Sequence, residues 1–241
     1  MLAGKQAVAT MKLVLTCEHG GNIIPREYAS LFEDHQEVLK THRGFDLGAF
    51  DLFEYLKPLS HVAHSSTTSR LLIELNRSLH HRNLFSEFSK KLSKENKDQL
   101  IQSYYLTYRH KIENQIMEFI SSEEKVLHVS VHSFTPVLNE DVRNSDLSLL
   151  FDSRKTSEKQ FCKGFKTSIL KKNPEYRIKF NYPYLGKSDG FTSYLRKLFP
   201  ENYLGIELEV NQKFSKNNKM DSQIKQDIYT VLECYSTGKL K

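Results

Sequence analysis

The sequence predicts one α/β domain with a mixed, largely parallel sheet flanked by helices. Short apolar runs alternate along the chain with longer segments in which apolar residues recur every three or four positions. The length of 241 residues suits one domain, and the 6 prolines and 10 glycines form no linker that would divide it. Alternating strands and helices are typical of a sheet covered on both faces. We expect an N-terminal extension over 1–11 and the domain over 12–241.

The expected strands are short runs rich in apolar and β-branched residues. The first of them is continuously apolar, as in a buried central strand, and Gly20 and Gly21 stop it. The run before His132 has the β-branched alternation of a strand. In chain order, the expected strands are 12–17, 61–64, 71–75, 125–131, 147–151, 176–180 and 203–210.

The expected helices are amphipathic segments with recognisable beginnings. Pro25 opens the first, because proline is favoured in the first helical turn. The second carries Leu52, Phe53 and Leu56 at helical spacing. In chain order, the expected helices are 25–32, 46–56, 95–121, 159–171, 190–198 and 220–235.

Composition excludes several function classes. The 35 Lys and Arg against 29 Asp and Glu give a net charge of +6, but the excess is spread thinly, which argues against a nucleic-acid groove and allows a small anionic substrate. No apolar run approaches the roughly 20 residues of a membrane span. Three widely spaced cysteines form neither a metal pair nor an even disulfide set. We therefore expect reduced thiols and a cytoplasmic protein without membrane or nucleic-acid partners.

Polar side chains that can bind a metal follow several of the strands. His19 and His132 stand at two strand ends, and ligand sites in such sheets lie beyond the carboxyl ends of the strands. A catalytic zinc takes three protein ligands from His and carboxylate and leaves a fourth position open. Gly20 and Gly21 would let the backbone return Asn22 to the same centre. Either histidine alone would more often be structural, and only the combination favours a metal site.

A carboxylate and two arginines complete the candidate site. Glu209 follows Glu207 by two positions in an apolar strand, where burial would raise its pKa and suit it to act as a base. The alternative is that both glutamates pair with surface lysines. Arg77, beside Asn76, is the first candidate for binding a substrate carboxylate, since guanidinium pairs with carboxylate in bidentate fashion.

Other assignments in this region stay open. Arg70 is a second candidate for the substrate carboxylate, or it forms an internal ion pair with Glu74. Asp46 is either functional or a helix N-cap. Tyr184 lies in a glycine-containing loop that could close over the site, together with Lys187 and Thr192. Cys17, two residues before His19, suggests a thiol nucleophile as an alternative to metal chemistry, or it packs as an inert buried thiol.

Six segments of the chain resemble the N-formylglutamate amidohydrolase family. They are spread over most of the chain, and the first and third are the most specific. The segments are 15–22 (LTCEHGGN), 42–49 (HRGFDLGA), 69–77 (SRLLIELNR), 132–136 (HSFTP), 181–184 (NYPY) and 209–211 (EVN).

The resemblance implies a zinc exopeptidase-like fold of the phosphorylase/hydrolase type and one catalytic divalent metal. The metal would be zinc, with cobalt and manganese as alternatives. On the family frame His19 and His132 are metal ligands and Glu209 is the general base. Asn22 stands where related zinc enzymes have a glutamate, and an amide is a poorer ligand, so Glu18 or Asp46 are the available substitutes.

The activity implied is metal-dependent hydrolysis of N-formyl-L-glutamate to formate and L-glutamate in amino-acid catabolism. The resemblance points to Asn76 and Arg77 as the pair that binds the substrate carboxylate. Two alternatives remain: hydrolysis of another N-acyl amino acid or of a C-terminal peptide residue, and a binding domain that has lost its metal. The sequence does not indicate an oligomeric state.

Overall fold

A six-stranded mixed sheet forms the centre of the molecule. The computed structural model describes residues 11–237, and its strands lie in the order β2-β1-β3-β8-β6-β7. The first four strands in this order are mutually parallel, whereas β6 is antiparallel to β8 and parallel to β7. Their bounds are β1 Lys12–Cys17, β2 Val62–Ser65, β3 Val126–Phe134, β6 Leu147–Leu150, β7 Ile178–Phe180 and β8 Tyr203–Asn211.

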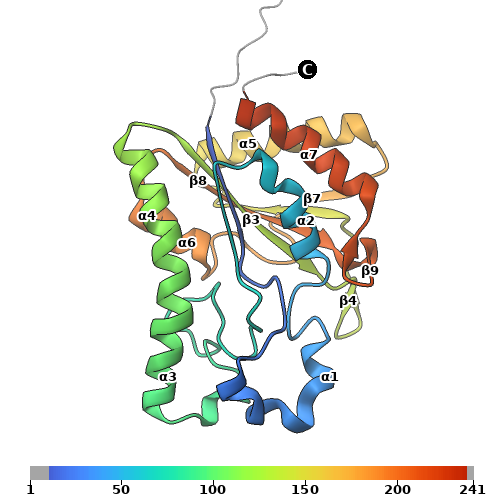
Figure 1. Cartoon of the computed structure of the whole chain (residues 1–241). Helices are drawn as coiled ribbons and strands as arrows, with labels where there is room; N and C mark the ends of the chain where they lie inside the picture. The colour runs from blue at the N-terminus through green and yellow to red at the C-terminus, as the bar shows by residue number, and fades with distance from the viewer. Residues whose placement is uncertain (1–10, 238–241) are drawn as a thin grey trace, which may run out of the picture.

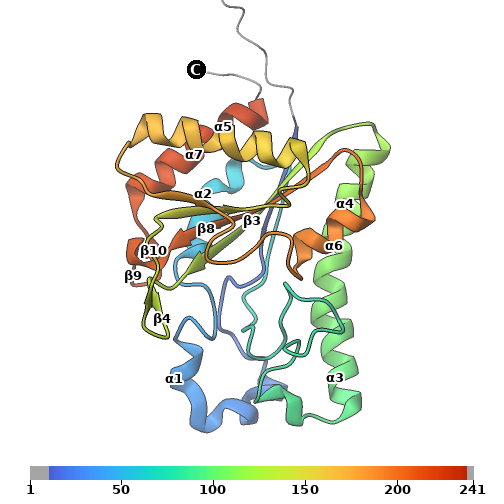
Figure 2. The same ribbon diagram turned by 180° about the vertical axis from the view of Figure 1, so that it is seen from behind.

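Helices cover both faces of this sheet (Figures 1 and 2). On one face α2, α5 and α7 pack against the strands around Leu15, Val129 and Ile206. On the other face lie α3, α4 and α6, together with the segment that carries Ile73. The helices are α1 Gln36–Leu39, α2 Ala49–Leu56, α3 Lys94–Leu100, α4 Thr107–Ser121, α5 Thr156–Lys172, α6 Phe191–Leu198 and α7 Ser222–Thr237.

Short elements connect this framework. A π-helical stretch, Ile101–Leu106, joins α3 to α4, so the long helix expected over 95–121 is continuous. The 3-10 helices are Arg26–His35, Lys57–Leu59, Ser89–Lys91 and Gln212–Phe214. Two small hairpins were not expected from the sequence: β4 Val137–Leu138 with β5 Asp141–Val142, and β9 Ser215–Lys216 with β10 Lys219–Met220.

The prediction of a strand over 71–75 is wrong. These residues form turns, in which the backbone N–H of Leu72 donates to Ser69 and that of Glu74 donates to Leu84. Leu71, Leu72 and Ile73 are all buried in the core. A continuous apolar run shows that a segment is buried, but it does not show that its backbone pairs in a sheet.

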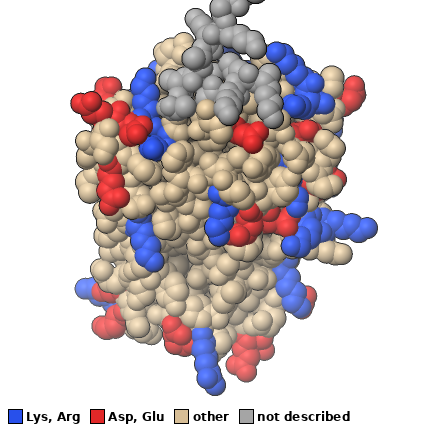
Figure 3. Space-filling view, turned by 45° about the horizontal axis from the view of Figure 1, so that its top comes forward, with Lys and Arg blue, Asp and Glu red and all other residues tan. Residues whose placement is uncertain are grey.

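The distribution of charge, the state of the cysteines and the length of the helices bear on the expectations drawn from composition. Figure 3 shows basic and acidic side chains interspersed on the face in view rather than gathered by sign. Cys17, Cys162 and Cys234 are free. Among the described residues, no helix combines the length and the apolar character that crossing a membrane requires. Apart from Met11, the extension expected over 1–11 lies outside the described residues.

Candidate active site

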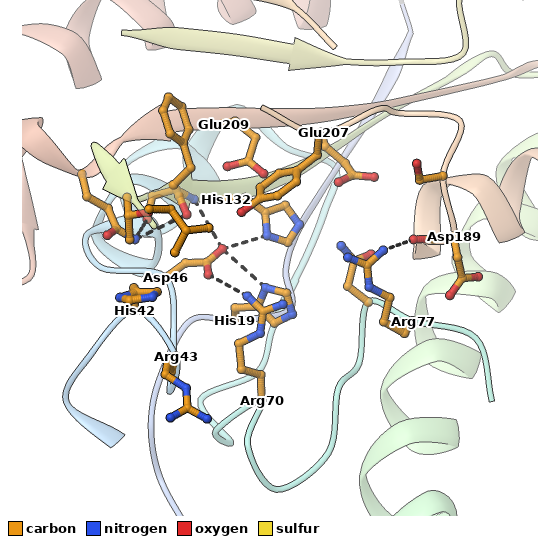
Figure 4. Close-up of a pocket in the computed structure, with 18 of the residues that line it drawn as sticks. His19, His42, Arg43, Asp46, Arg70, Arg77, His132, Asp189, Glu207 and Glu209 are labelled. Atoms are coloured by element: carbon orange, nitrogen blue, oxygen red, sulfur yellow. Dashed lines mark hydrogen bonds and ion pairs between the residues drawn. The ribbon is translucent and has the colours of Figure 1, made fainter. Parts of the chain in front are cut away.

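A cavity of about 470 Å³, lined mostly by polar and charged residues, opens at the carboxyl ends of β1, β3 and β8. His19 follows β1, His132 lies near the end of β3, and Glu209 lies near the end of β8, and all three line the cavity. Because the three strands are parallel neighbours, their carboxyl ends meet at one edge of the sheet. The sheet thereby brings together His19 and His132, which are 113 positions apart in the chain (132 − 19), and His132 and Glu209, which are 77 positions apart (209 − 132) (Figure 4).

His19, Asp46 and His132 form a buried group of three ligand atoms that lie within 4.8 Å of one another. Asp46 Oδ2 is 2.9 Å from Nδ1 of His132 and 3.4 Å from Nδ1 of His19. Both imidazoles therefore present the same nitrogen to one carboxylate oxygen. The other oxygen of Asp46, Oδ1, accepts a hydrogen bond of 3.3 Å from Arg70.

The loop before α2 brings Asp46 to the two histidines. The backbone N–H of Asp46 donates to the carbonyl of His19, which fastens this loop directly beside β1. Gly48 is the N-cap of α2 and has φ of 78°, a left-handed conformation that favours glycine. No side chain caps this helix, so the alternative assignment of Asp46 as the N-cap is wrong. The carboxylate of Asp46 is turned toward the cavity instead.

Buried carboxylates hold the far nitrogen of each imidazole. Glu74 Oε1 lies 2.5 Å from Nε2 of His19. Nε2 of His132 is 3.2 Å from Glu18 Oε2 and 2.8 Å from Ser130 Oγ. Such partners fix the ring orientation of metal-binding histidines and increase their basicity. No sequence pattern marks Glu18 and Glu74 for this role. The spacing of Ser130 and His132, two residues apart, does place both on the same face of β3.

The electrostatics of this group suit a bound cation. Burial alone would raise the pKa of Asp46, but His19, His132 and Arg70 hold it well below its usual range. Burial and Arg70 oppose protonation of His19, yet Glu74 and Asp46 raise its pKa. Carboxylates around two imidazoles thus favour positive charge at this point.

The three residues also fit a small dication by geometry and donor type. Ligand atoms about 2.0–2.1 Å from a tetrahedral ion lie about 3.3 Å from one another. The two separations from Asp46 Oδ2, 2.9 and 3.4 Å, are close to that value. Two imidazoles and a carboxylate are a donor set found at catalytic zinc. His19, Asp46 and His132 therefore fit the metal that the resemblance implies.

Asn22, which the sequence predicted as a metal ligand, lies apart from this group. Its side-chain amide donates to the carbonyl of Leu39, and Asn22 does not line the cavity. Of the two substitutes that the sequence left open, Asp46 stands in the group, whereas Glu18 lies behind His132. Cys17 also does not line the cavity, and burial raises the pKa of its thiol, which contradicts the thiol-nucleophile alternative.

Glu209 has the properties expected of a buried base. It is 5% exposed, and its Oε2 has no hydrogen-bond partner among the described residues. Burial raises its pKa to about 7; His132 opposes this shift and the charge of Asp46 adds to it. Glu209 is the register partner of His132 on the neighbouring strand. Among residues 11–237, no lysine pairs with Glu209, and Glu207 accepts a hydrogen bond from Thr192, so the alternative of lysine-paired surface glutamates is wrong.

The two candidate arginines have different surroundings. Arg70 Nη2 lies 2.6 Å from Glu74 Oε2, so the internal ion pair left open by the sequence is formed. This is so because 71–75 is a turn rather than a strand, which brings positions 70 and 74 into contact. Arg77 donates to the backbone carbonyl of Asp189, and within the described part of the chain no carboxylate pairs with it.

Asn76 lies beside Arg77 and also lines the cavity. Its Oδ1 accepts a hydrogen bond from the backbone N–H of Phe191 at 2.8 Å, which leaves its amide nitrogen to donate to a ligand. From the glycine-containing loop, Tyr184 lines the cavity, whereas Thr192 donates to Glu207 and Lys187 is not among the lining residues.

Comparisons with known proteins identify the family and the fold of this chain. The family model described as FGase, N-formylglutamate amidohydrolase, matches residues 11–215. The comparison with curated proteins finds no match. The structure is similar to the crystal structure of a gene product from Agrobacterium tumefaciens, with a TM-score of 0.76 and 20% identity over 97% of this chain and 92% of that chain.

A second solved structure is an N-formylglutamate amidohydrolase from Ralstonia eutropha. It aligns with a TM-score of 0.71 and 14% identity over 95% of this chain and 93% of that chain. At these identities the two structures establish the fold, and the match of the family model over most of the sequence establishes the relationship. The chain belongs to the N-formylglutamate amidohydrolase family, a family of hydrolases.

Proposed function

We propose that this protein is a metal-dependent hydrolase that cleaves the amide of N-formyl-L-glutamate to formate and L-glutamate. The observation that carries the proposal is the buried group of His19, Asp46 and His132, with Glu209 in the same cavity. Oε2 of Glu209 has no hydrogen-bond partner in the part of the chain that the structure describes. Membership of the family supports the reaction type. Zinc is the first choice of metal, because imidazole and carboxylate ligands suit it, and cobalt or manganese are alternatives.

His19, Asp46 and His132 would hold the ion, and Glu74 and Glu18 would keep the two rings oriented. When bound, such an ion acts as a Lewis acid toward the amide carbonyl and lowers the pKa of water. Glu209 takes a proton from the attacking water. It then passes that proton to the nitrogen of the leaving amino acid. Its raised pKa, about 7, makes both transfers accessible near neutral pH.

Asn76 and Arg77 are proposed to bind the α-carboxylate of the substrate. Arg77 offers a guanidinium without a paired carboxylate in the described chain, and Asn76 offers its amide nitrogen. We assign Arg70 a different role from the one expected of it. Because its charge is shared between Glu74 and Asp46, Arg70 orients Asp46 rather than binding the substrate.

Hydrolysis of another N-acyl amino acid is the second candidate, because the cavity is open and its volume of about 470 Å³ would admit a larger acyl group. A metal-free binding domain is disfavoured, because Asp46 lies with the two histidines and offers a carboxylate where Asn22 could offer only an amide.

A substrate panel tests the proposal. Purified protein, first freed of metal by chelation and then loaded with zinc, is incubated with the N-formyl, N-acetyl and N-succinyl derivatives of L-glutamate. Release of the acid is measured for each. Hydrolysis of the formyl compound that needs metal supports the proposal. Cleavage of only the acetyl or succinyl compound favours the second candidate, and no cleavage with any metal refutes a hydrolase.

A further inference from the structure

Arg143 follows the β4–β5 hairpin and is buried without a counter-charge. It is 7% exposed, and no carboxylate in the described part of the chain forms an ion pair with it. Its Nε is enclosed and lacks a hydrogen-bond partner among the described residues. An unpaired buried charge is unfavourable, and buried charges are normally paired. Arg196, for comparison, is buried to the same extent and pairs with Glu158 at 2.7 Å.

Two hydroxyl groups extend this cation toward the cavity. Arg143 Nη1 donates to Thr135 Oγ1 at 3.3 Å and to the hydroxyl oxygen of Tyr184 at 3.2 Å. A guanidinium has no acceptor, so both hydroxyl oxygens must accept, and each hydroxyl hydrogen stays available to donate. Thr135 and Tyr184 both line the cavity. The three side chains therefore form one group of hydrogen-bond donors around a positive charge.

This group lies at the end of the cavity opposite Arg77. Figure 1 shows β4, whose hairpin leads into Arg143, on the opposite side of the molecule from α4, whose Arg109 donates to the backbone carbonyl of Arg77. Arg143 is also one of the cations that, with burial, lower the pKa of His42. Figure 4 shows His42 and Arg77 on opposite sides of the pair formed by His19 and His132. Besides Arg77, two arginines line the cavity: Arg43 pairs with Glu87, and Arg70 pairs with Glu74.

Within the described part of the chain, the cavity thus has Arg77 at one end and, at the other, the hydroxyl groups of Thr135 and Tyr184 backed by the buried charge of Arg143, with the reaction centre between them. Leu138 and Leu185 also line it and offer apolar surface to the methylene groups of a ligand. A ligand that satisfies both ends carries two anionic groups joined by a short aliphatic chain.

We propose that Arg143, Thr135 and Tyr184 bind the side-chain carboxylate of an N-acyl dicarboxylic amino acid, while Arg77 binds its α-carboxylate. This inference rests on the proposed function and names its substrate class. Hydrogen bonds from charged donors to carboxylates are among the strong ones. A site built to bind a polar group rejects analogues that lack it, because its own polar groups are left unpaired.

Steady-state kinetics of zinc-loaded variants test the proposal with two substrates, N-formyl-L-glutamate and the uncharged N-formyl-L-norleucine. We expect Arg143→Met to lower kcat/KM for the charged substrate about 10- to 100-fold and to change that for the uncharged one less than about threefold. Thr135→Val keeps the guanidinium and should lower only the charged substrate's kcat/KM, by a smaller factor. It carries the test if Arg143→Met does not fold.

Arg43→Met is the matched control, because Arg43 lines the same cavity but is paired with Glu87. It should leave the ratio of the two kcat/KM values unchanged. Equal losses for both substrates in Arg143→Met, or an unchanged preference for the charged substrate, would overturn the proposal.

A binding measurement separates this inference from the proposed function. Calorimetry compares glutarate, which has two carboxylates, with butyrate, which has one. We expect the wild-type protein to bind glutarate more tightly and Arg143→Met to lose that preference. If no N-formyl compound is hydrolysed but the Arg143-dependent preference is found, the reaction assignment fails and the binding site stands. If the wild type does not prefer glutarate, the binding site is refuted whatever the reaction.

Discussion

Glu209→Gln should change how the stability of the metal-free protein depends on pH. The free energy of unfolding of the variant, minus that of the wild type, should be larger in alkaline than in acidic solution. Burial raises the pKa of Glu209 from 4.5 to about 7, so the folded state binds this proton more tightly than the unfolded state. The contribution is fully present below pH 4.5 and is lost as the pH rises through 7. A rise in pKa from 4.5 to about 7 corresponds to about 3 kcal/mol. Glutamine, which resembles the protonated acid, does not titrate.

Urea unfolding in the presence of a chelator at pH 5 and pH 8 measures the effect. We expect the stability difference, variant minus wild type, to rise by about 2 to 3 kcal/mol between the two conditions. Asp51→Asn is the control. Burial raises the pKa of Asp51, but Lys225 and Lys219 hold it below 3.8, so the stability that this carboxylate contributes is complete above that pH. The stability difference between this variant and the wild type should therefore be the same at pH 5 and pH 8. The same Glu209→Gln variant should lose about 10²- to 10⁴-fold in kcat. A stability difference that is equal at both pH values would refute the burial argument.

Three further predictions concern the metal and the base. Asp46→Ala should abolish stoichiometric zinc binding measured by metal analysis, whereas Asn22→Ala should retain it; the reverse result would restore Asn22 as the ligand. Glu74→Gln should weaken zinc affinity about 10- to 100-fold in a chelator competition, because Glu74 orients His19. Glu54→Gln, on the exposed face of α2, is the control and should leave the affinity unchanged. Equal zinc affinities of the two variants would show that Glu74 does not orient His19. The kcat/KM of the zinc enzyme should fall on the acid side with a midpoint between pH 4.5 and 7, since Glu209 must be ionised to accept a proton and the bound cation lowers its pKa; a profile that is flat over this range would contradict the assignment.

The sequence predicted the parts of the site that lie on strands. His19, His132 and Glu209 all occupy strand ends, and parallel strands necessarily bring such ends together. The alternation of apolar and polar segments likewise predicted the sheet and the main helices, which the structure confirms.

The parts that lie on loops could not be predicted in the same way. Asp46 reaches the histidines because its backbone N–H bonds to His19 across 27 positions, and no local pattern encodes that contact. The sequence pattern predicts a strand over 71–75, where the structure has a turn, because a buried apolar run looks the same in both conformations. Arg143 follows a two-residue strand of a hairpin, so neither periodicity nor a strand end marked it.

The central claim is that one dication held by His19, Asp46 and His132 makes this chain a hydrolase of N-formyl-L-glutamate. The most direct measurement is formate release from N-formyl-L-glutamate while the metal-free protein is titrated with zinc. We expect the rate to rise linearly to one equivalent of zinc per chain and then to level off. Formate release that is complete without added metal, or none at any ratio of zinc to protein, would contradict the claim.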